Sequence, residues 1–226
     1  MNDRMLALTT ILLLAVAVPL VPAVAADTAP VAVAPVPGPG PQEIIKDTAV
    51  RLLESLDADR EGYRRNPERI RKLVDELMLP HFDSDYAARL VLARHWRTAT
   101  PEQRKRFIDA FYQRMLRNYG SALAEFTADR LTVLPFKGDL ASGQATVRTE
   151  IRRDDGTRVP VNYSVRGTPR GWKAWDVTIE GISYVKNFRT DFGAEIEQKG
   201  LEAVIARLEA ENQKAEAPKG AGASKA

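Results

Sequence analysis

The sequence predicts an α+β fold in which helices cover one face of an antiparallel sheet. Apolar residues recur with the 3.6-residue period of helices from residue 42 to about residue 126. Between residues 130 and 180 they alternate with polar residues, which is the two-residue period of strands, and the helical period returns at Tyr184. A run of strands set between two groups of helices favours the α+β class over a parallel α/β sheet.

Residues 1–25 predict a secretory signal peptide. Arg4 provides a positive charge, residues 6–18 form an apolar run, and Ala23-Val24-Ala25 fits the small-residue cleavage pattern. The run is short for a membrane span, and no stop-transfer pattern follows it. The chain has no cysteine, which excludes both a lipid-anchored lipoprotein and disulfides. Export without disulfides fits the periplasm of a Gram-negative bacterium.

Three segments are expected after the signal peptide. Residues 26–41 contain five prolines among Ala, Val and Gly and predict an extended linker. Residues 42–212 contain the amphipathic segments and all 16 aromatic residues, so they predict the packed domain. Residues 213–226 are rich in Ala, Gly and Lys and predict a disordered tail. The net charge of +3 does not indicate nucleic-acid binding, which needs a concentrated basic face.

Three helices are expected in the first part of the domain. An apolar stripe over residues 44–56 predicts the first helix. The second follows Asn66 and Pro67, which suit the N-cap and the first helical position, and it ends at Pro80. The third is expected over residues 83–97.

A longer fourth helix is expected to begin at Pro101. Thr100 and Gln103 have the spacing of a capping box around that proline. The helix of about six turns then carries a wide, aromatic-rich stripe, which must lie against a large apolar surface. The main row of this stripe is Phe107, Phe111, Met115 and Tyr119.

The strands predict a meander with one apolar and one polar face. Strands are expected over residues 130–136, from residue 145 to a hairpin turn at 154–157, and on both sides of a second turn at 167–171. Trp175, Val177 and Ile179 are expected on the apolar face of the last strand, opposite Asp176 and Glu180. After the sheet, the spacing of Tyr184, Phe188, Phe192 and Ile196 predicts a helix that Gly200 separates from a short closing helix.

No set of residues indicates an enzyme. The two histidines, His81 and His95, are not spaced as metal ligands, and no cysteine is present to hold zinc. The sequence lacks the nucleophile-elbow, P-loop and dinucleotide-binding glycine motifs. Asp176 and Glu180 could form a catalytic pair only if a pocket opened on the polar face of the sheet. No cofactor is expected.

Three blocks of sequence resemble the MlaC family of periplasmic phospholipid-binding proteins, also called toluene-tolerance auxiliary proteins. They are LARHWRTATPEQRKRFIDAFYQRMLRNYGSAL at 92–123, VNYSV with GWKAWDVTIEGISYVKNFRTDF at 161–192, and GLEAVIARLE at 200–209. No single short motif is diagnostic, but the order and spacing of the blocks are specific, and the likeness spans residues 42–212. The resemblance implies a curved sheet wrapped by helices, similar to the nuclear-transport-factor and cystatin-like folds, with an apolar cavity between sheet and helices.

The resemblance also implies a function: a carrier that holds the acyl tails of a phospholipid and shuttles it between inner and outer membranes, maintaining outer-membrane lipid asymmetry. Its implied partners are the lipid-binding subunit of an inner-membrane ABC transporter and an outer-membrane lipoprotein–porin complex. The expected lipid-binding residues are Tyr86, Leu90, Phe107, Phe111, Met115, Tyr119, Val147, Ile151, Val161, Tyr163, Trp175, Val177, Ile179, Tyr184 and Phe188. An aspartate at Phe111 or Val147 is expected to abolish lipid binding, because it would place a charge against the tails.

Alternatives remain open from the residues alone. Sequence patterns do not separate a filled core from a lined cavity. A carrier for another lipid, such as a hopanoid, would have the same kind of lining. An enzyme on a cone-shaped fold like that of steroid isomerases would need a carboxylate inside the pocket, and a protein-binding adaptor would have a filled core.

Overall fold

The computed structural model describes residues 36–123, 130–136, 140–153 and 155–216, without the side chains of 67, 118–123 and 216. The expected signal peptide at 1–25 lies outside these residues. The helices are α1 (Pro41–Ala58), α2 (Arg60–Arg65), α3 (Pro67–Leu77), η1 (Leu79–His81), α4 (Ser84–Leu92), α5 (His95–Thr98), α6 (Pro101–Leu123), η3 (Leu140–Ser142), α7 (Tyr184–Lys199) and α8 (Leu201–Glu216). The strands are β1 (Leu131–Val133), β2 (Gln144–Arg152), β3 (Arg158–Thr168), β4 (Gly171–Ile179) and β5 (Ile182–Ser183).

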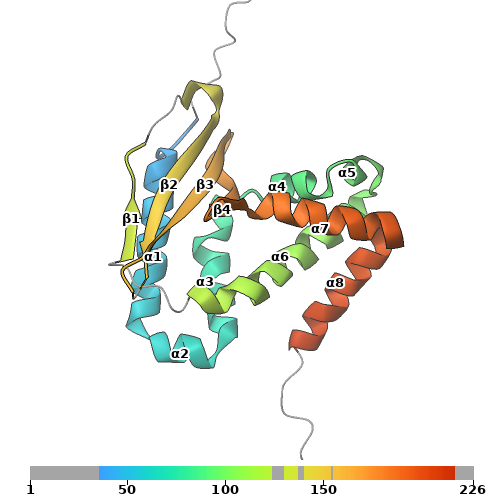
Figure 1. Ribbon diagram of the computed structural model, residues 1–226, viewed down its shortest axis with the longest axis horizontal. Helices are drawn as coiled ribbons and strands as arrows, with labels where there is room; N and C mark the ends of the chain where they lie inside the picture. Colours follow the sequence, from blue (N-terminus) through green and yellow to red (C-terminus); the bar gives the residue numbers. More distant parts are fainter. Residues whose placement is uncertain (1–35, 124–129, 137–139, 154, 217–226) are drawn as a thin grey trace, which may run out of the picture. The chain divides into compact units, whose positions relative to one another are not determined.

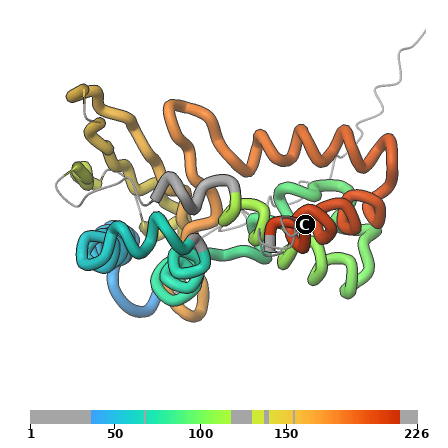
Figure 2. Tube along the Cα trace, turned by 90° about the horizontal axis from the view of Figure 1, so that it is seen from below, coloured from blue at the N-terminus to red at the C-terminus, as the bar shows by residue number. Residues whose placement is uncertain are grey.

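The five strands form one antiparallel sheet in the order β1-β2-β3-β4-β5 (Figure 1). The α+β prediction is therefore confirmed. Helices α1, α2 and α3 gather on one side of the strands (Figure 2), and α4, α6, α7 and α8 pack together beyond β4 (Figure 1).

The start of α6 is the local prediction that the structure reproduces in most detail. Thr100 accepts a hydrogen bond from the backbone N–H of Gln103 at 3.2 Å, and Gln103 Oε1 accepts one from the backbone N–H of Thr100 at 3.1 Å. This reciprocal pair is the predicted capping box, and it satisfies two N–H groups that the first turn of a helix leaves without partners.

The helix predicted over residues 83–97 is instead two helices, α4 and α5. Ala93 separates them with a φ of 47°, a left-handed conformation that interrupts helical geometry. The chain turns there, and Arg104 of α6 reaches back to donate to the Trp96 carbonyl at 3.0 Å. The sequence did not predict this break, because the residue at the break is an alanine and not a glycine or proline.

The ends of the domain extend further than the sequence predicted. Helix α8 continues to Glu216 instead of ending at 212, since Asn212 donates to the Ala110 carbonyl at 3.0 Å and Arg114 pairs with Glu211 at 2.6 Å. At the other end Val36, within the expected linker, packs against the buried residues beneath α1. Gly167 makes this possible, because a Cβ there would overlap the Val36 side chain.

A β-bulge in β4 changes which residues face the helices. Ser164 pairs with Asp176 and Val165 pairs with Ala174, so Trp175 is an extra residue in the ladder. Ala174 and Val177 consequently share one face, and Trp175 lies on the other. The prediction that Trp175 shares a face with Val177 and Ile179 is therefore wrong.

The described residues form four groups of buried apolar side chains, and the two largest lie among the later helices and beneath α1. Helices α4, α6, α7 and α8 enclose a closed helical core, in which Phe107 is fully buried. A second group lies where α1 covers the sheet, and it includes Val147 and Val165. Between these two groups, the sheet and the helices do not touch, and an apolar space remains between them.

Candidate functional site

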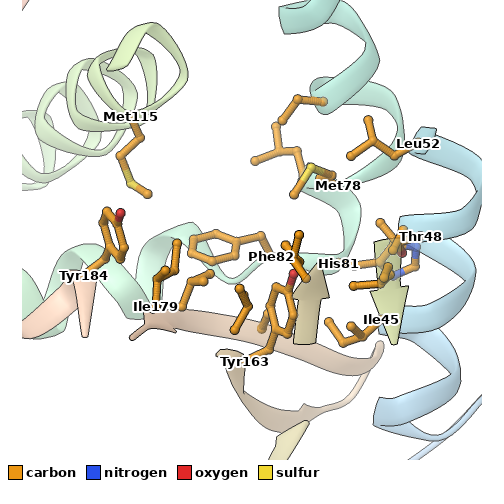
Figure 3. A pocket seen from close by; sticks show the side chains of 18 of the residues that line it. Ile45, Thr48, Leu52, Met78, His81, Phe82, Met115, Tyr163, Ile179 and Tyr184 are labelled. Carbon is orange, nitrogen blue, oxygen red and sulfur yellow. The ribbon is translucent and has the colours of Figure 1, made fainter. Parts of the chain in front are cut away.

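An apolar cavity of about 440 Å³ lies between the sheet and helices α1, α3 and α6. Its volume is within the range of roughly 300–1,000 Å³ that is usual for ligand sites. Figure 3 shows the side chains that converge on it from the sheet below and from the helices around it. The lining comprises Ile45, Thr48, Ala49, Leu52, Leu53, Val74, Met78, Leu79, His81, Phe82, Tyr112, Met115, Leu116, Leu131, Ile151, Arg153, Val159, Val161, Tyr163, Ala174, Val177, Ile179 and Tyr184.

The lining residues follow the helical spacing on the helices and the two-residue alternation on the strands. On α1 they are spaced three and four apart, so that Ile45, Thr48 and Leu52 lie along one face of the helix. On β3 they alternate as Val159, Val161 and Tyr163, with intervening residues on the opposite face. The cavity is thus the gap between an amphipathic helix layer and the apolar face of the sheet.

The polar atoms near the wall are largely paired within the protein. Tyr112 donates to Asp75 on α3, and burial together with this bond raises the pKa of the Tyr112 phenol. Burial also raises the pKa of Tyr163. The phenols of Tyr112 and Tyr163 therefore stay neutral at physiological pH. The hydroxyl of Thr149, which is fully buried, donates to the Val161 carbonyl at 2.8 Å.

Arg153 is the one charged side chain in the described lining. It is solvent-exposed and lies 3.6 Å from Glu180, so its charge stays at the edge of the cavity. Among the lining residues that the structure describes, none carries a carboxylate, and most are apolar.

Asp176 is buried on the opposite side of β4 from the cavity. Although it is only 4% exposed, it accepts hydrogen bonds from Ser183 Oγ at 2.6 Å and from the backbone N–H of Val185 at 3.0 Å. These bonds fix the start of α7, where a negative charge is favourable. Neither Asp176 nor Glu180 lines the cavity.

Seven of the fifteen predicted site residues lie on the cavity wall. They are Met115, Ile151, Val161, Tyr163, Val177, Ile179 and Tyr184. The side chain of Tyr119 lies outside the described residues.

The structure places the other seven away from the wall. Phe107, Phe111 and Phe188 belong to the closed helical core, and Leu90 packs against it. Val147 is buried beneath α1. Tyr86 and Trp175 meet edge to face, with ring centroids 5.6 Å apart, outside the cavity. Since both side chains are buried in the fold, an aspartate at Phe111 or Val147 is expected to destabilise the protein as well as to reduce lipid binding.

The site residues predicted from the sequence include none of the lining residues on α1 or within residues 74–82. The amphipathic stripe of α1 was visible, but every such stripe fits a filled core equally well. The lining residues Ala49 and Thr48 were the available signal, since a small and a polar side chain interrupt the large apolar residues of that stripe.

Comparison with known proteins identifies the family of this chain. The family model described as MlaC protein matches residues 46–210. The chain belongs to the MlaC family.

Individual relatives agree with the family assignment. The toluene tolerance protein ttg2D of Pseudomonas putida is 30% identical over 161 residues, which cover 71% of this chain and 74% of the relative. The intermembrane phospholipid transport system binding protein MlaC of Haemophilus influenzae is 21% identical over 172 residues, covering 75% and 80%.

A solved structure shows the same fold. The phospholipid-binding protein from Ralstonia solanacearum, solved in complex with a phospholipid, has a TM-score of 0.71 and 26% sequence identity to this chain. The match covers 76% of this chain and 97% of that one.

Two structural features are absent from the described residues of this MlaC-family chain. Within those residues, no group of three His, Cys, Asp or Glu side chains is placed to hold a metal ion. None of the helices in the described part of the chain has the length and apolarity needed to cross a membrane.

Proposed function

We propose that this protein is a periplasmic phospholipid carrier that holds acyl tails in its cavity and shuttles lipid between the inner and outer membranes. The observation that carries the proposal is the cavity itself, whose wall is apolar on the sheet side and on the helix side. The family membership and the phospholipid in the Ralstonia structure support the choice of ligand.

Hydrocarbon burial explains why such a carrier needs an interior of this kind. Each methylene exposed to water costs about 0.8 kcal/mol, so two tails with roughly thirty methylenes cost on the order of 24 kcal/mol in water. A wall of side chains such as Leu52, Val161 and Ile179 offsets that cost. The headgroup stays outside, next to Arg153, and contributes little selectivity.

The partners and the periplasmic setting that we propose are those that membership of the family implies. Lipid is exchanged with the lipid-binding subunit of an inner-membrane ABC transporter and with an outer-membrane lipoprotein–porin complex. Exchange at both membranes maintains the lipid asymmetry of the outer membrane. The direction of net transport depends on the relative affinities at the two membranes and on ATP use by the transporter.

The cavity favours a carrier over a protein-binding adaptor, because an adaptor gains nothing from unfilled apolar space, which destabilises a core. A carrier of another lipid, such as a hopanoid, is the second candidate, since a wall of aliphatic and aromatic side chains also accommodates fused rings.

The test is native mass spectrometry of the protein expressed with its leader and isolated from the periplasm, followed by lipid extraction and identification. We expect one diacyl phospholipid per chain with a mixed headgroup composition. A hopanoid in the extract would support the second candidate. An empty protein that also takes up no lipid from vesicles would overturn the carrier proposal.

A further inference from the structure

One large apolar side chain at the edge of the sheet is mostly exposed to solvent. Ile182 on β5 is 62% exposed, more than the other exposed large apolar residues in the described part of the chain, Leu140 at 40% and Val50 at 37%. Single exposed apolar residues are common on protein surfaces and need no explanation by themselves. Ile182 differs from the other two in what lies beside it.

The turn between β4 and β5 places Ile182 on the cavity side of the sheet. The two central residues of this turn, Glu180 and Gly181, have positive φ values of 50° and 83°, which are typical of a tight two-residue hairpin. Ile182 pairs directly with Ile179, and residues that are directly opposed in an antiparallel pair share a face. Because Ile179 lines the cavity, Ile182 continues the apolar surface beyond the point where the lining ends.

The cavity reaches the surface beside this turn. Arg153 lines the cavity, yet its side chain is solvent-exposed, and it lies 3.6 Å from Glu180 in the turn. Figure 3 shows Ile179 and Tyr184 close together at the end of the cavity opposite the residues of α1. Residues on both sides of Ile182 along the chain therefore belong to the wall, while Ile182 itself lies at the edge of the wall.

We infer that Ile182 forms an apolar lip over which acyl tails enter and leave the cavity. The inference rests on the proposed function, and it adds the route by which the lipid is exchanged. Methylene groups are unfavourable in water, so a tail that leaves the wall at Ile179 is stabilised when it next meets an apolar side chain instead of solvent. A headgroup beside Arg153 is next to the same turn, so headgroup and tails can leave the protein together.

A lip of this kind has a kinetic consequence. Ile182 is not among the residues that line the cavity, so it contacts the lipid during passage and not in the bound state. Its apolar surface then stabilises the transition state of exchange without stabilising the complex. Altering Ile182 should therefore change the rates of uptake and release by the same factor and leave the equilibrium occupancy unchanged. A residue of the wall would instead change the occupancy.

The experiment measures lipid exchange in both directions on the protein isolated from the periplasm. Stopped-flow fluorescence follows the uptake of a fluorescent phosphatidylethanolamine from vesicles of phosphatidylethanolamine and phosphatidylglycerol. Release is followed by mixing the loaded protein with unlabelled vesicles of the same composition. Ile182→Ser removes most of the exposed apolar surface, and we expect both rates to fall about tenfold. The fraction of protein loaded at equilibrium should match that of the wild type.

Two further variants serve as controls. Val50→Ser makes the same kind of change at an exposed residue of α1 that does not line the cavity, and it should exchange lipid like the wild type. Ile182→Leu keeps the apolar surface at the edge of the sheet and should keep the wild-type rates. Urea denaturation checks that all three variants are as stable as the wild type, as expected for exposed positions.

Wild-type rates in Ile182→Ser would overturn the inference, and so would an equal slowing in Val50→Ser. A lower occupancy without slower uptake would place Ile182 in the wall and would also overturn the lip. Co-sedimentation with the vesicles is measured alongside. If slower exchange in Ile182→Ser is matched by an equal loss of vesicle binding, the residue anchors the protein at a membrane, and the lip is wrong.

The carrier proposal fails on a different result. If the wild-type protein neither carries lipid from the periplasm nor takes it up from vesicles, the proposed function is wrong. If the wild type exchanges lipid and Ile182→Ser exchanges it equally fast, only the lip is wrong.

Discussion

The two halves of α6 lie in contrasting surroundings although they carry one continuous stripe. In the first half, Phe107 and Phe111 are buried among helices, with Phe192 5.5 Å from Phe107 and Phe188 5.1 Å from Phe111 between edge-to-face ring centroids. In the second half, Met115 and the residues beside it border the cavity. The stripe is similar in the two halves, and the neighbouring layers differ.

The neighbours decide whether the stripe becomes core or wall. Helices α4, α7 and α8 surround the first half, and aromatic rings fill the space between them. The second half is flanked by α3, while the sheet lies across the cavity from it. A helix can therefore be anchored at one end by dense packing and present the same kind of side chain to an open cavity at the other end.

The largest expected effect comes from truncating the buried half. Phe107→Ala should destabilise the fold by about 3–5 kcal/mol, because a fully buried ring leaves an unfilled space behind it. Met115→Ala, two turns along, should cost less than half as much, since its side chain already borders open volume. Urea denaturation of both variants measures the difference. Equal losses would contradict the division of α6 into core and wall.

A polar side chain in the wall should affect lipid binding more than folding. Ile179→Asn places an amide against the tails without a partner, and we expect a loss of about 2 kcal/mol in lipid affinity, roughly thirtyfold. The matched control is Thr178→Asn, the adjacent position on the opposite face of β4, which should bind lipid like the wild type. Transfer of labelled phospholipid from vesicles measures both. If the two variants lose affinity equally, the cavity is not the binding site.

The smallest expected effect concerns the ion pair between Glu195 on α7 and Arg207 on α8. Arg207 contacts both carboxylate oxygens of Glu195, at 2.8 and 2.6 Å, and this hydrogen bonding holds the Glu195 pKa below its usual range. A lowered folded-state pKa stabilises the protein above the unfolded-state value of about 4.3, and this stabilisation is lost as the pH falls through the lower folded-state value. Glu195→Gln should therefore lose roughly 0.5–1 kcal/mol at pH 7 and show a shallower decline below pH 5.

Urea denaturation at several pH values from 7 to 3 tests this expectation. Asp109→Asn is the control, because the Lys105–Asp109 pair is well exposed and should contribute less. A Glu195→Gln profile parallel to that of the wild type would show that the pair adds no pH-dependent stability to the helical core.

The features that the sequence predicted correctly depend on local interactions. The capping box at Thr100 and the antiparallel meander follow from spacing within a few residues, and the structure contains both. The division between core and cavity could not be predicted this way, because it depends on which layers face each half of α6. The break at Ala93 and the extra residue Trp175 also lacked a local signal, since neither position carries a glycine or proline.

The bulge at Trp175 bears on how relatives of this chain are aligned. A single inserted residue lets β4 keep Ala174 and Val177 toward the cavity while Asp176 anchors α7 from the reverse side. Deleting that residue would restore strict alternation and turn either the cavity residues or the anchoring carboxylate to the wrong side. A relative that lacks a residue at this position would therefore present different side chains on the two faces of β4. Such a relative would need another hydrogen-bonding group to hold the start of α7.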